Sequence, residues 1–317
     1  MRMATFLRRL LASLAEREAR TLVLAAVLLL TAALLPPLDL KRDSWDTVVV
    51  FDLTQSMNVE DYDVNGQPVS RLAFAREAAK RALRELPCGS RVGWAGFAEY
   101  RTLLLLAPVE VCAYYGDLVA ALDNIDGRMR WGNSSEVAKG VFWSVRAAKE
   151  LGEGTQVVFI SDGQEAPPLR DGDRPGFEDI KPGEVRGWIL GAGGDAPQPI
   201  PKSDEDGRTI GVWKAGEVIQ RDAMLPDGRR VPGTEHLSSR REPHLRALAQ
   251  QVGFDYATLD DAAVLARAMK HDGAALRRPV PTDLNWLPAL LALALLLFRF
   301  RPERPARGLS ATPVSER

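Results

Sequence analysis

Two short runs of β-branched residues, each ending in small oxygen-bearing side chains, constrain the fold of this chain most strongly. The first run extends from Val48 to Phe51 and is followed by Asp52, and the second extends from Val157 to Ile160 and is followed by Ser161 and Asp162. Such runs are typical of buried parallel strands, and open α/β sheets bind ligands at the carboxyl ends of their strands. We therefore expect the two aspartates to meet at one edge of a parallel sheet.

Elsewhere, helical and strand-like patterns alternate along the chain. Apolar residues at helical spacing predict helices over residues 71–86, 116–125, 137–151, 241–252 and 261–270. Further strands are predicted over 91–97, 101–107, 185–190 and 254–259, with a small hairpin around 209–220 inside a polar loop. This alternation indicates an α/β fold with a doubly wound, mostly parallel sheet, in which the hairpin over 91–107 contributes one antiparallel edge strand.

The chain contains two cysteines, Cys88 and Cys112, which flank the predicted hairpin over 91–107. A tight hairpin brings the residues at its two outer ends together, so the spacing predicts a disulfide. The alternative is a pair of unpaired thiols in the core, since sequence alone cannot fix the separation of the two Cα atoms.

Two uncharged apolar segments, Thr21 to Leu35 and Leu284 to Phe298, lie near the ends of the chain and have arginines on their outer sides. The excess of arginine predicts that both termini are cytoplasmic and that the region between the segments is exported. Each segment is shorter than the roughly 20 residues that usually span a bilayer, and the first could instead be a signal peptide. The predicted organisation is a cytoplasmic segment at 1–20, transmembrane helices at 21–37 and 284–300, an exported domain at 38–283 and a cytoplasmic tail at 301–317.

The composition argues against several classes of function. A formal net charge of −1 and the lack of a basic run are unlike nucleic-acid-binding proteins. The sequence also lacks the H-E-x-x-H pattern of zinc proteases and the G-x-S-x-G turn of serine hydrolases.

The residues after the first strand predict a metal site. Asp52, Thr54 and Ser56 are two positions apart, so a loop leaving the strand can turn all of them toward one point, where Asp162 from the second strand also lies. Carboxylates and hydroxyls are hard donors that suit Mg²⁺, Mn²⁺ or Ca²⁺. A site with few direct carboxylates leaves the ion able to accept an anionic oxygen from elsewhere.

Ser135, at the start of the predicted helix over 137–151, is a candidate fifth contributor. The neighbouring Ser134 remains open as an alternative ligand. The same residues also fit a capping box, in which Asn133 caps the helix and Glu136 reaches back to it, and in that case Ser135 would have no metal role.

Asp52, Thr54, Ser56, Ser135 and Asp162 together resemble the metal-ion-dependent adhesion site (MIDAS) of the von Willebrand factor A (vWA) family. That motif is D-x-S-x-S after the first strand, a threonine in a later loop and an aspartate after the fourth strand. In this chain Thr54 stands at the position of the first serine, and Ser135 stands at the position of the threonine. The resemblance implies a Rossmann-like vWA fold, a divalent cation, Mg²⁺ first, and a protein partner that completes the site with an acidic side chain. It implies no enzymatic activity.

A narrower resemblance rests on the flanking apolar segments and on short stretches such as Asn58 to Tyr62 and Ala107 to Cys112. These are similar to membrane-anchored Bat-type proteins, and most of all to the MxaL family of methanol-oxidation accessory proteins. The resemblance implies a two-pass protein of the bacterial inner membrane with its vWA domain in the periplasm, acting in calcium insertion during maturation of methanol dehydrogenase. It further implies other membrane accessory proteins and a MoxR-type AAA+ ATPase as partners.

Two alternatives remain at this point. A phosphatase of the haloacid dehalogenase type also places an aspartate after a first parallel strand and uses Mg²⁺, but it requires a second aspartate where this chain has Thr54. The other is a metal-free scaffold in which the polar cluster only terminates the strands.

Overall fold

The computed structural model describes residues 17–169, 179–204, 206–224 and 229–301. The chain divides into two compact units, of which one comprises residues 1–40 and 280–317 and the other residues 41–279. Most of the predicted cytoplasmic segments, at 1–20 and 301–317, lies outside the described residues.

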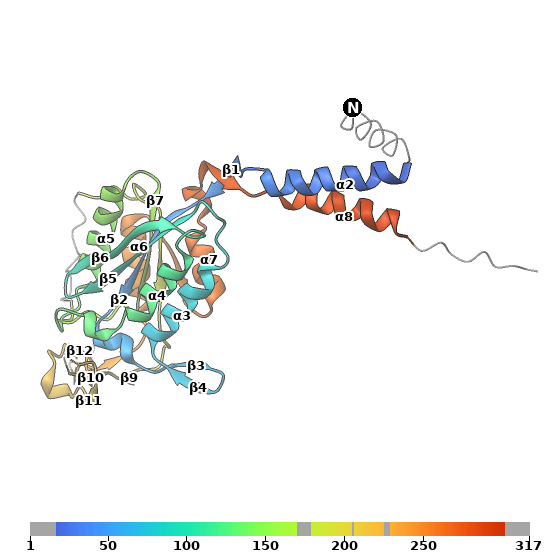
Figure 1. Ribbon diagram of the computed structural model, residues 1–317. Helices are drawn as coiled ribbons and strands as arrows, with labels where there is room; N and C mark the ends of the chain where they lie inside the picture. Colours follow the sequence, from blue (N-terminus) through green and yellow to red (C-terminus); the bar gives the residue numbers. More distant parts are fainter. Residues whose placement is uncertain (1–16, 170–178, 205, 225–228, 302–317) are drawn as a thin grey trace, which may run out of the picture. The chain divides into compact units, whose positions relative to one another are not determined.

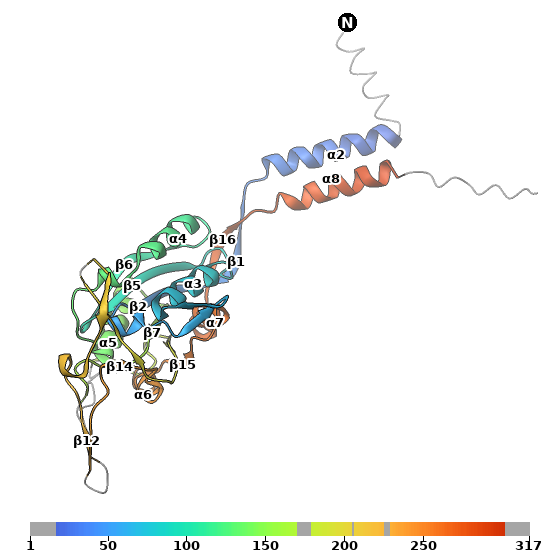
Figure 2. The same ribbon diagram turned by 90° about the horizontal axis from the view of Figure 1, so that it is seen from below.

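The smaller unit contains two apolar helices, α2 (Arg17–Leu34) and α8 (Trp286–Arg299), which lie side by side (Figures 1 and 2). Ala25 and Ala292 are buried, and small residues of this kind let helix backbones approach closely. Both helices match the predicted apolar segments, although α2 ends before Pro36 and α8 is shorter than expected. Among the described residues, no helix combines the length and apolar character needed to cross a membrane.

A six-stranded sheet forms the centre of the larger unit, in the order β15-β8-β7-β2-β5-β6. Neighbouring strands are parallel except β5 and β6, which form an antiparallel hairpin at one edge. The predicted mostly parallel sheet with one antiparallel edge strand is therefore confirmed. Its strands are β2 (Asp46–Asp52), β5 (Arg91–Ala98), β6 (Arg101–Glu110), β7 (Thr155–Ser161), β8 (Gly187–Gly191) and β15 (Asp255–Thr258).

Helices cover both faces of this sheet, which makes it doubly wound (Figure 1). Side chains alternate along β2, so Val49 and Phe51 pack in one buried cluster with α3, α4 and α7, while Val48 and Val50 pack in a second cluster with α5 and α6. Burial on both faces explains why the sequence of β2 is an unbroken apolar run. The helices are α3 (Arg71–Leu83), α4 (Tyr115–Asn124), α5 (Val137–Leu151), α6 (Glu242–Val252) and α7 (Ala262–Met269).

Residues 195–240, which we call the crest insertion, connect β8 to α6, and their described part contains short strands. Figure 1 shows several of these strands at the same end of the domain as the hairpin of β3 (Tyr62–Val64) and β4 (Gln67–Val69). Strand β11 lies within the predicted hairpin around 209–220, but it pairs with the earlier strand β10, so the predicted partner was wrong. The paired strands are β9 (Gln198–Pro199) with β14 (Leu237–Ser238), β10 (Pro201–Ser203) with β11 (Thr209–Val212), and β12 (Ala223–Met224) with β13 (Arg230–Val231).

Small elements complete the domain. Strands β1 (Leu38–Ser44) and β16 (Leu276–Thr282) form a two-stranded sheet, as do β3 (Tyr62–Val64) and β4 (Gln67–Val69). The Ser44 hydroxyl donates a 3.0 Å hydrogen bond to the carbonyl of Leu276. The short 3₁₀ helices are η1 (Gln55–Asn58), η2 (Gly127–Met129), η3 (Ala215–Glu217) and η4 (Asp272–Ala274).

Cys88 and Cys112 form a disulfide with their Cα atoms 5.3 Å apart, so the predicted bond is confirmed and the alternative of unpaired thiols is wrong. The bond lies beside the pairing of Arg91 with Glu110, at the end of the sheet away from Asp52. The Glu110 carboxylate also accepts 2.6 Å hydrogen bonds from the amides that follow the two cysteines, at Gly89 and Ala113.

We expect replacement of both cysteines by serine to lower the free energy of unfolding by about 3 kcal/mol, because the bond closes a loop between residues 24 positions apart. Denaturant unfolding of the oxidised protein and the variant measures the difference. Affinity for a metal at the opposite end of the sheet should not change. An unaltered unfolding midpoint, or a changed metal affinity, would contradict this prediction.

Candidate metal site

The side chains that follow β2 form a chain of hydrogen bonds. Thr54 donates to Asp52 Oδ1 both from its backbone amide, at 2.9 Å, and from its hydroxyl, at 2.6 Å. Ser56 Oγ lies 3.2 Å from Thr54 Oγ1, and because the Thr54 hydroxyl proton already points to Asp52, Ser56 is the donor in this pair. All three residues are buried. The structure thus brings together the first part of the predicted site.

Ser161, which the sequence analysis did not select, fixes the other oxygen of Asp52. It ends β7, directly beside β2, and its hydroxyl donates a 2.6 Å hydrogen bond to Asp52 Oδ2. The same hydroxyl accepts a 2.9 Å bond from the Gly163 amide. The signal for Ser161 was its place as the last residue of a strand adjacent to that of Asp52.

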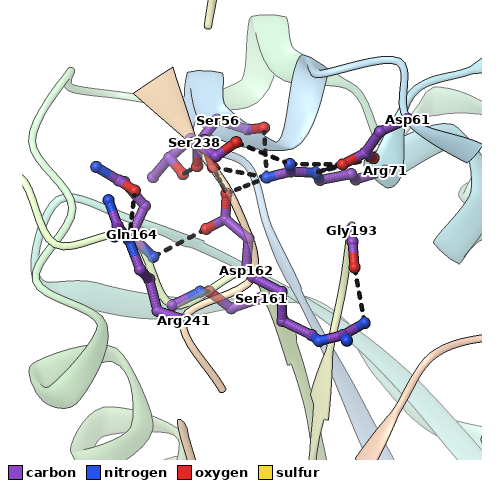
Figure 3. A network of polar contacts seen from close by, with 12 residues as sticks. Ser56, Asp61, Arg71, Ser161, Asp162, Gln164, Gly193, Ser238 and Arg241 are labelled. Atoms are coloured by element: carbon purple, nitrogen blue, oxygen red, sulfur yellow. Dashed lines mark hydrogen bonds and ion pairs between the residues drawn. The ribbon is translucent and has the colours of Figure 1, made fainter. Parts of the chain in front are cut away.

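Asp162 is paired with a buried arginine, Arg71, the first residue of α3 (Figure 3). Arg71 is fully buried, and its Nη1 lies 2.7 Å from Asp162 Oδ2. Ser238, from the crest insertion, accepts from Arg71 Nη1 at 2.6 Å and donates to Asp162 Oδ2 at 2.7 Å. The remaining Asp162 oxygen accepts a 2.9 Å bond from the Gln164 amide. The predicted aspartate is therefore present, but it already carries a counter-ion.

The other end of the guanidinium is held by Asp61, whose Oδ2 lies 2.6 Å from Arg71 Nη2 (Figure 3). Burial alone would raise the pKa of Asp61, but hydrogen bonds from Arg71 and from the Gly194 amide outweigh it and lower this pKa. Burial likewise opposes the charge of Arg71, and the carboxylates of Asp162 and Asp61 outweigh it and raise the pKa of Arg71. Asp61 thus faces inward as part of an internal ion network.

The pKa of Asp52, in contrast to that of Asp61, is raised. Burial raises its pKa to about 7, the nearby charge of Asp162 adds to the increase, and hydrogen bonds from Ser161 and Thr54 offset only part of it. Within this site the ionised form of Asp52 is therefore costly. A divalent cation close to Asp52 would remove that cost by supplying positive charge.

Ser135 lies in the loop before α5 and forms bridges to two other segments. Its amide donates a 2.7 Å bond to the carbonyl of Ala166, and its carbonyl accepts a 2.8 Å bond from the Ala166 amide. Its hydroxyl is buried and has no hydrogen-bond partner among the residues that the structure describes. Ser134 is more exposed, which favours Ser135 between the two alternatives.

The alternative capping box over 133–136 is wrong. The residue preceding α5 is Glu136, and its side chain makes no capping hydrogen bond. Asn133 Oδ1 instead accepts two hydrogen bonds, from Gln55 Nε2 at 2.9 Å and from Arg130 Nε at 3.3 Å. The first turn of α5 is capped from a distance by Glu165, which accepts from the amides of residues 137 and 138.

Thr54, Ser56 and Ser135 are among the residues that line one pocket of about 270 Å³. Ser135 offers an unpaired oxygen, and the hydroxyl oxygens of Thr54 and Ser56 keep lone pairs beyond the hydrogen bonds that they donate. An all-oxygen set of this kind fits a hard divalent cation. The carboxylate oxygens of Asp52 and Asp162 all accept hydrogen bonds, so in this arrangement they support the hydroxyls rather than face the pocket unpaired.

Gly193, which follows β8, explains part of the glycine-rich stretch after this strand. Its φ of +88° favours glycine, and a Cβ there would lie 2.3 Å from Arg71 Nε. Its amide donates to the Tyr62 hydroxyl at 3.1 Å. The stretch accommodates the buried arginine.

The sheet order, the helices on both faces and the polar residues at the carboxyl ends of β2 and β7 define an α/β protein with a doubly wound sheet and a polar cluster at one edge. No protein-family model matches the sequence, and no curated protein does either. The conserved hypothetical protein BatB from Bacteroides thetaiotaomicron has a similar structure, with a TM-score of 0.50 and 16% identity over 72% of this chain and 98% of BatB.

Two further solved structures are more distant. An aerotolerance-related membrane protein from Bacteroides fragilis has a TM-score of 0.49 and 14% identity over 72% of this chain and 97% of its own. A von Willebrand factor type A structure from Catenulispora acidiphila has a TM-score of 0.36 and 12% identity over 73% of this chain and 42% of its own. At these identities the similarity to BatB establishes a shared fold only.

Proposed function

We propose that this chain is a binding module in which a divalent cation, Mg²⁺ first and Mn²⁺ or Ca²⁺ next, joins the domain to an acidic side chain of a partner protein. The observation that carries the proposal is the buried hydroxyl of Ser135, which has no partner within the described ranges and belongs to a residue that lines the same pocket as Thr54 and Ser56. An unsatisfied buried polar atom is costly, and a bound cation would satisfy it.

The residues have distinct roles in this proposal. Thr54, Ser56 and Ser135 would hold the ion through neutral oxygens, while Asp52 and Asp162 supply negative charge behind them. Arg71 neutralises part of that charge at 2.7 Å from Asp162. The cation itself would supply a Lewis-acidic position. Because the direct ligands are neutral hydroxyls, the bound ion would remain able to attract a carboxylate from a partner protein.

Ser135→Ala provides the sharpest test, because two measurements should change in opposite directions. Loss of an unsatisfied buried hydroxyl should stabilise the metal-free protein by about 1 kcal/mol. Loss of a ligand should weaken Mg²⁺ binding at least roughly tenfold, since losing even an outer-shell partner has effects of that size. Thermal unfolding in chelator and Mg²⁺ titration calorimetry measure the two effects.

The matched control is Ser134→Ala, which removes the neighbouring, more exposed hydroxyl. It should change neither measurement appreciably. A ligand at 100 times its dissociation constant should stabilise the protein by about 2.7 kcal/mol. If increasing concentrations of Mg²⁺, Mn²⁺ and Ca²⁺ all left the unfolding temperature unchanged, the metal-free scaffold would be the better description.

For the cellular setting, we propose a membrane-anchored domain on the periplasmic side that serves as an accessory factor in methanol dehydrogenase maturation, with calcium insertion as the step served. The short sequence stretches similar to the MxaL family support this placement. Exposed apolar side chains on both α2 and α8, such as Leu30 and Leu297, support attachment to lipid. A MoxR-type AAA+ ATPase and other membrane accessory proteins are the further partners proposed.

Affinity capture tests this setting. Full-length protein should capture methanol dehydrogenase from native periplasm in Mg²⁺, and much less of it in chelator or with Asp52→Ala. Capture that is equal under all these conditions would count against a metal bridge. Absence of methanol dehydrogenase among metal-dependent partners would count against this client while leaving the cation-binding module in place.

A further inference from the structure

The pocket beside the candidate metal site is lined by residues of two chemical kinds, several of them from the crest insertion. The hydroxyl-bearing residues are Thr54, Ser56 and Ser135, on the side of the candidate metal site. The apolar lining includes Pro167, Ile200, Trp213 and Ile219. A ligand that fills the pocket must therefore present a polar group and an apolar group next to each other.

Trp213 is held in place from several directions. Its indole Nε1 donates a 2.8 Å hydrogen bond to Gln55 Oε1, and its amide donates a 3.0 Å bond to the carbonyl of Ile200. The ammonium of Lys202 lies 4.4 Å from the centre of the indole ring. An aromatic wall fixed in this way loses little conformational entropy when a ligand binds.

Gln55 connects this wall to the candidate metal site. It lies between Thr54 and Ser56 in the sequence, and its Oε1 accepts from Trp213 and, at 3.2 Å, from the amide of Ser203. Its Nε2 donates a 2.9 Å bond to Asn133, two residues before Ser135. The Gln55 side chain therefore links Trp213 to the loop that carries Thr54 and Ser56 and to the segment before Ser135.

The carboxylates that line the pocket already have internal partners. Glu165 accepts from the first amides of α5 and lies 2.8 Å from His244 Nε2. Glu217 lies 2.9 Å from Lys202 Nζ, and Glu235 accepts a 3.1 Å bond from the Arg221 amide. These acidic groups are therefore used by the fold itself. What the pocket offers a ligand is a cation position together with an apolar recess.

We infer that the partner recognised by this site is a protein segment in which an aspartate or glutamate is adjacent to a large apolar residue. The carboxylate binds the cation held by Thr54, Ser56 and Ser135, and the apolar side chain contacts Trp213 and Ile219. This inference rests on the proposed cation-dependent function and adds the neighbouring residue as a second determinant of specificity. The pocket volume of about 270 Å³ limits recognition to a short segment.

A random heptapeptide library displayed on phage tests the inference with the full-length protein in detergent. Phage bound in Mg²⁺ and released by chelator are sequenced. The expected result is enrichment of acidic residues flanked at one neighbouring position by Leu, Ile, Met or Phe. Synthetic peptides from the selection should bind Trp213→Ala roughly tenfold more weakly than the unchanged protein, with Mg²⁺ affinity itself retained.

Two further variants keep the test independent of folding. Ile219→Asp introduces a charge at a side chain that is 68% exposed, so it should weaken peptide binding without affecting the fold. Trp143→Ala removes a tryptophan on α5 that does not line the pocket, and it should leave peptide affinity unchanged.

The outcomes separate this inference from the proposed function. Metal-dependent enrichment of acidic residues without any apolar neighbour, or equal binding by Trp213→Ala and Ile219→Asp, would overturn the inference while leaving the cation-dependent module intact. Failure to select any chelator-released peptide would overturn both. Apolar enrichment that persists in chelator would overturn the link between the recess and the cation.

Discussion

Replacement of Arg71 by methionine should lower the free energy of unfolding by about 3–5 kcal/mol, because removing one partner of a buried ion pair leaves the other charges uncompensated. Arg71 is fully buried, and its guanidinium lies 2.7 Å from Asp162 and 2.6 Å from Asp61. After the substitution, only hydroxyl and amide donors would remain beside Asp162. Urea unfolding followed by tryptophan fluorescence measures the loss.

Arg81→Met is the matched control, since Arg81 is exposed on the same helix. It should change the stability by less than about 0.5 kcal/mol. Because a bound cation supplies positive charge near Asp162, saturating Mg²⁺ should restore part of the stability that Arg71→Met loses. Equal stabilities for the two variants would show that the Arg71 network does not support the fold as described.

Asp52→Asn should abolish measurable Mg²⁺ binding and at the same time stabilise the metal-free protein at neutral and alkaline pH. Asparagine can accept the hydrogen bonds from Thr54 and donate to Ser161 Oγ, so the local geometry can be retained. It lacks the buried charge. Calorimetry with Mg²⁺ and thermal unfolding in chelator provide the two measurements.

The pH dependence has a defined sign. The pKa of Asp52 is raised from its ordinary value of 3.8 to about 7 in the folded protein, so the unfolded chain loses this proton first. The stability contributed by protonated Asp52 is fully present below about pH 4 and is lost as the pH rises to about 7. Asp52→Asn should lack this decline.

Metal reverses the trend, because the cation competes with the Asp52 proton. Stabilisation by Mg²⁺ should therefore increase as the pH rises through about 7. Asp63→Asn, at the exposed middle position of β3, is the control and should behave like the unchanged protein. If Asp52→Asn kept the pH profile of the unchanged protein, Asp52 would not be the group that titrates.

The sheet and helices could be predicted because their signals are local. The unbroken apolar run of β2 reflects burial on both faces, and the spacing of apolar residues in α5 reflects a single buried face. Asp52, Thr54 and Ser56 could be placed for the same reason, since a strand end fixes where the following loop begins. The disulfide followed from the hairpin that it flanks.

The Arg71 network could not be predicted, because Asp162 and Ser238 come from parts of the chain that are distant from Arg71. Arg71 reads as a charged residue at the start of an amphipathic helix, where exposure is the usual result. Its burial depends on Asp162 and Ser238, which are 91 and 167 positions away. The hydrogen bond between Gln55 and Asn133, which replaces the expected capping box, spans 78 positions and could not be predicted from the sequence either.

The paired strands β1 and β16 hold the two ends of the domain next to each other. The Ser44 hydroxyl bonds the Leu276 carbonyl at 3.0 Å, and Arg278 binds Asp46 at 2.6 Å, so the chain enters and leaves the domain at neighbouring points. A domain with adjacent ends can be grafted into a surface loop of an unrelated carrier without stretching its termini. Residues 41–279 could therefore serve as a cassette that brings a cation-dependent recognition surface to a carrier of choice.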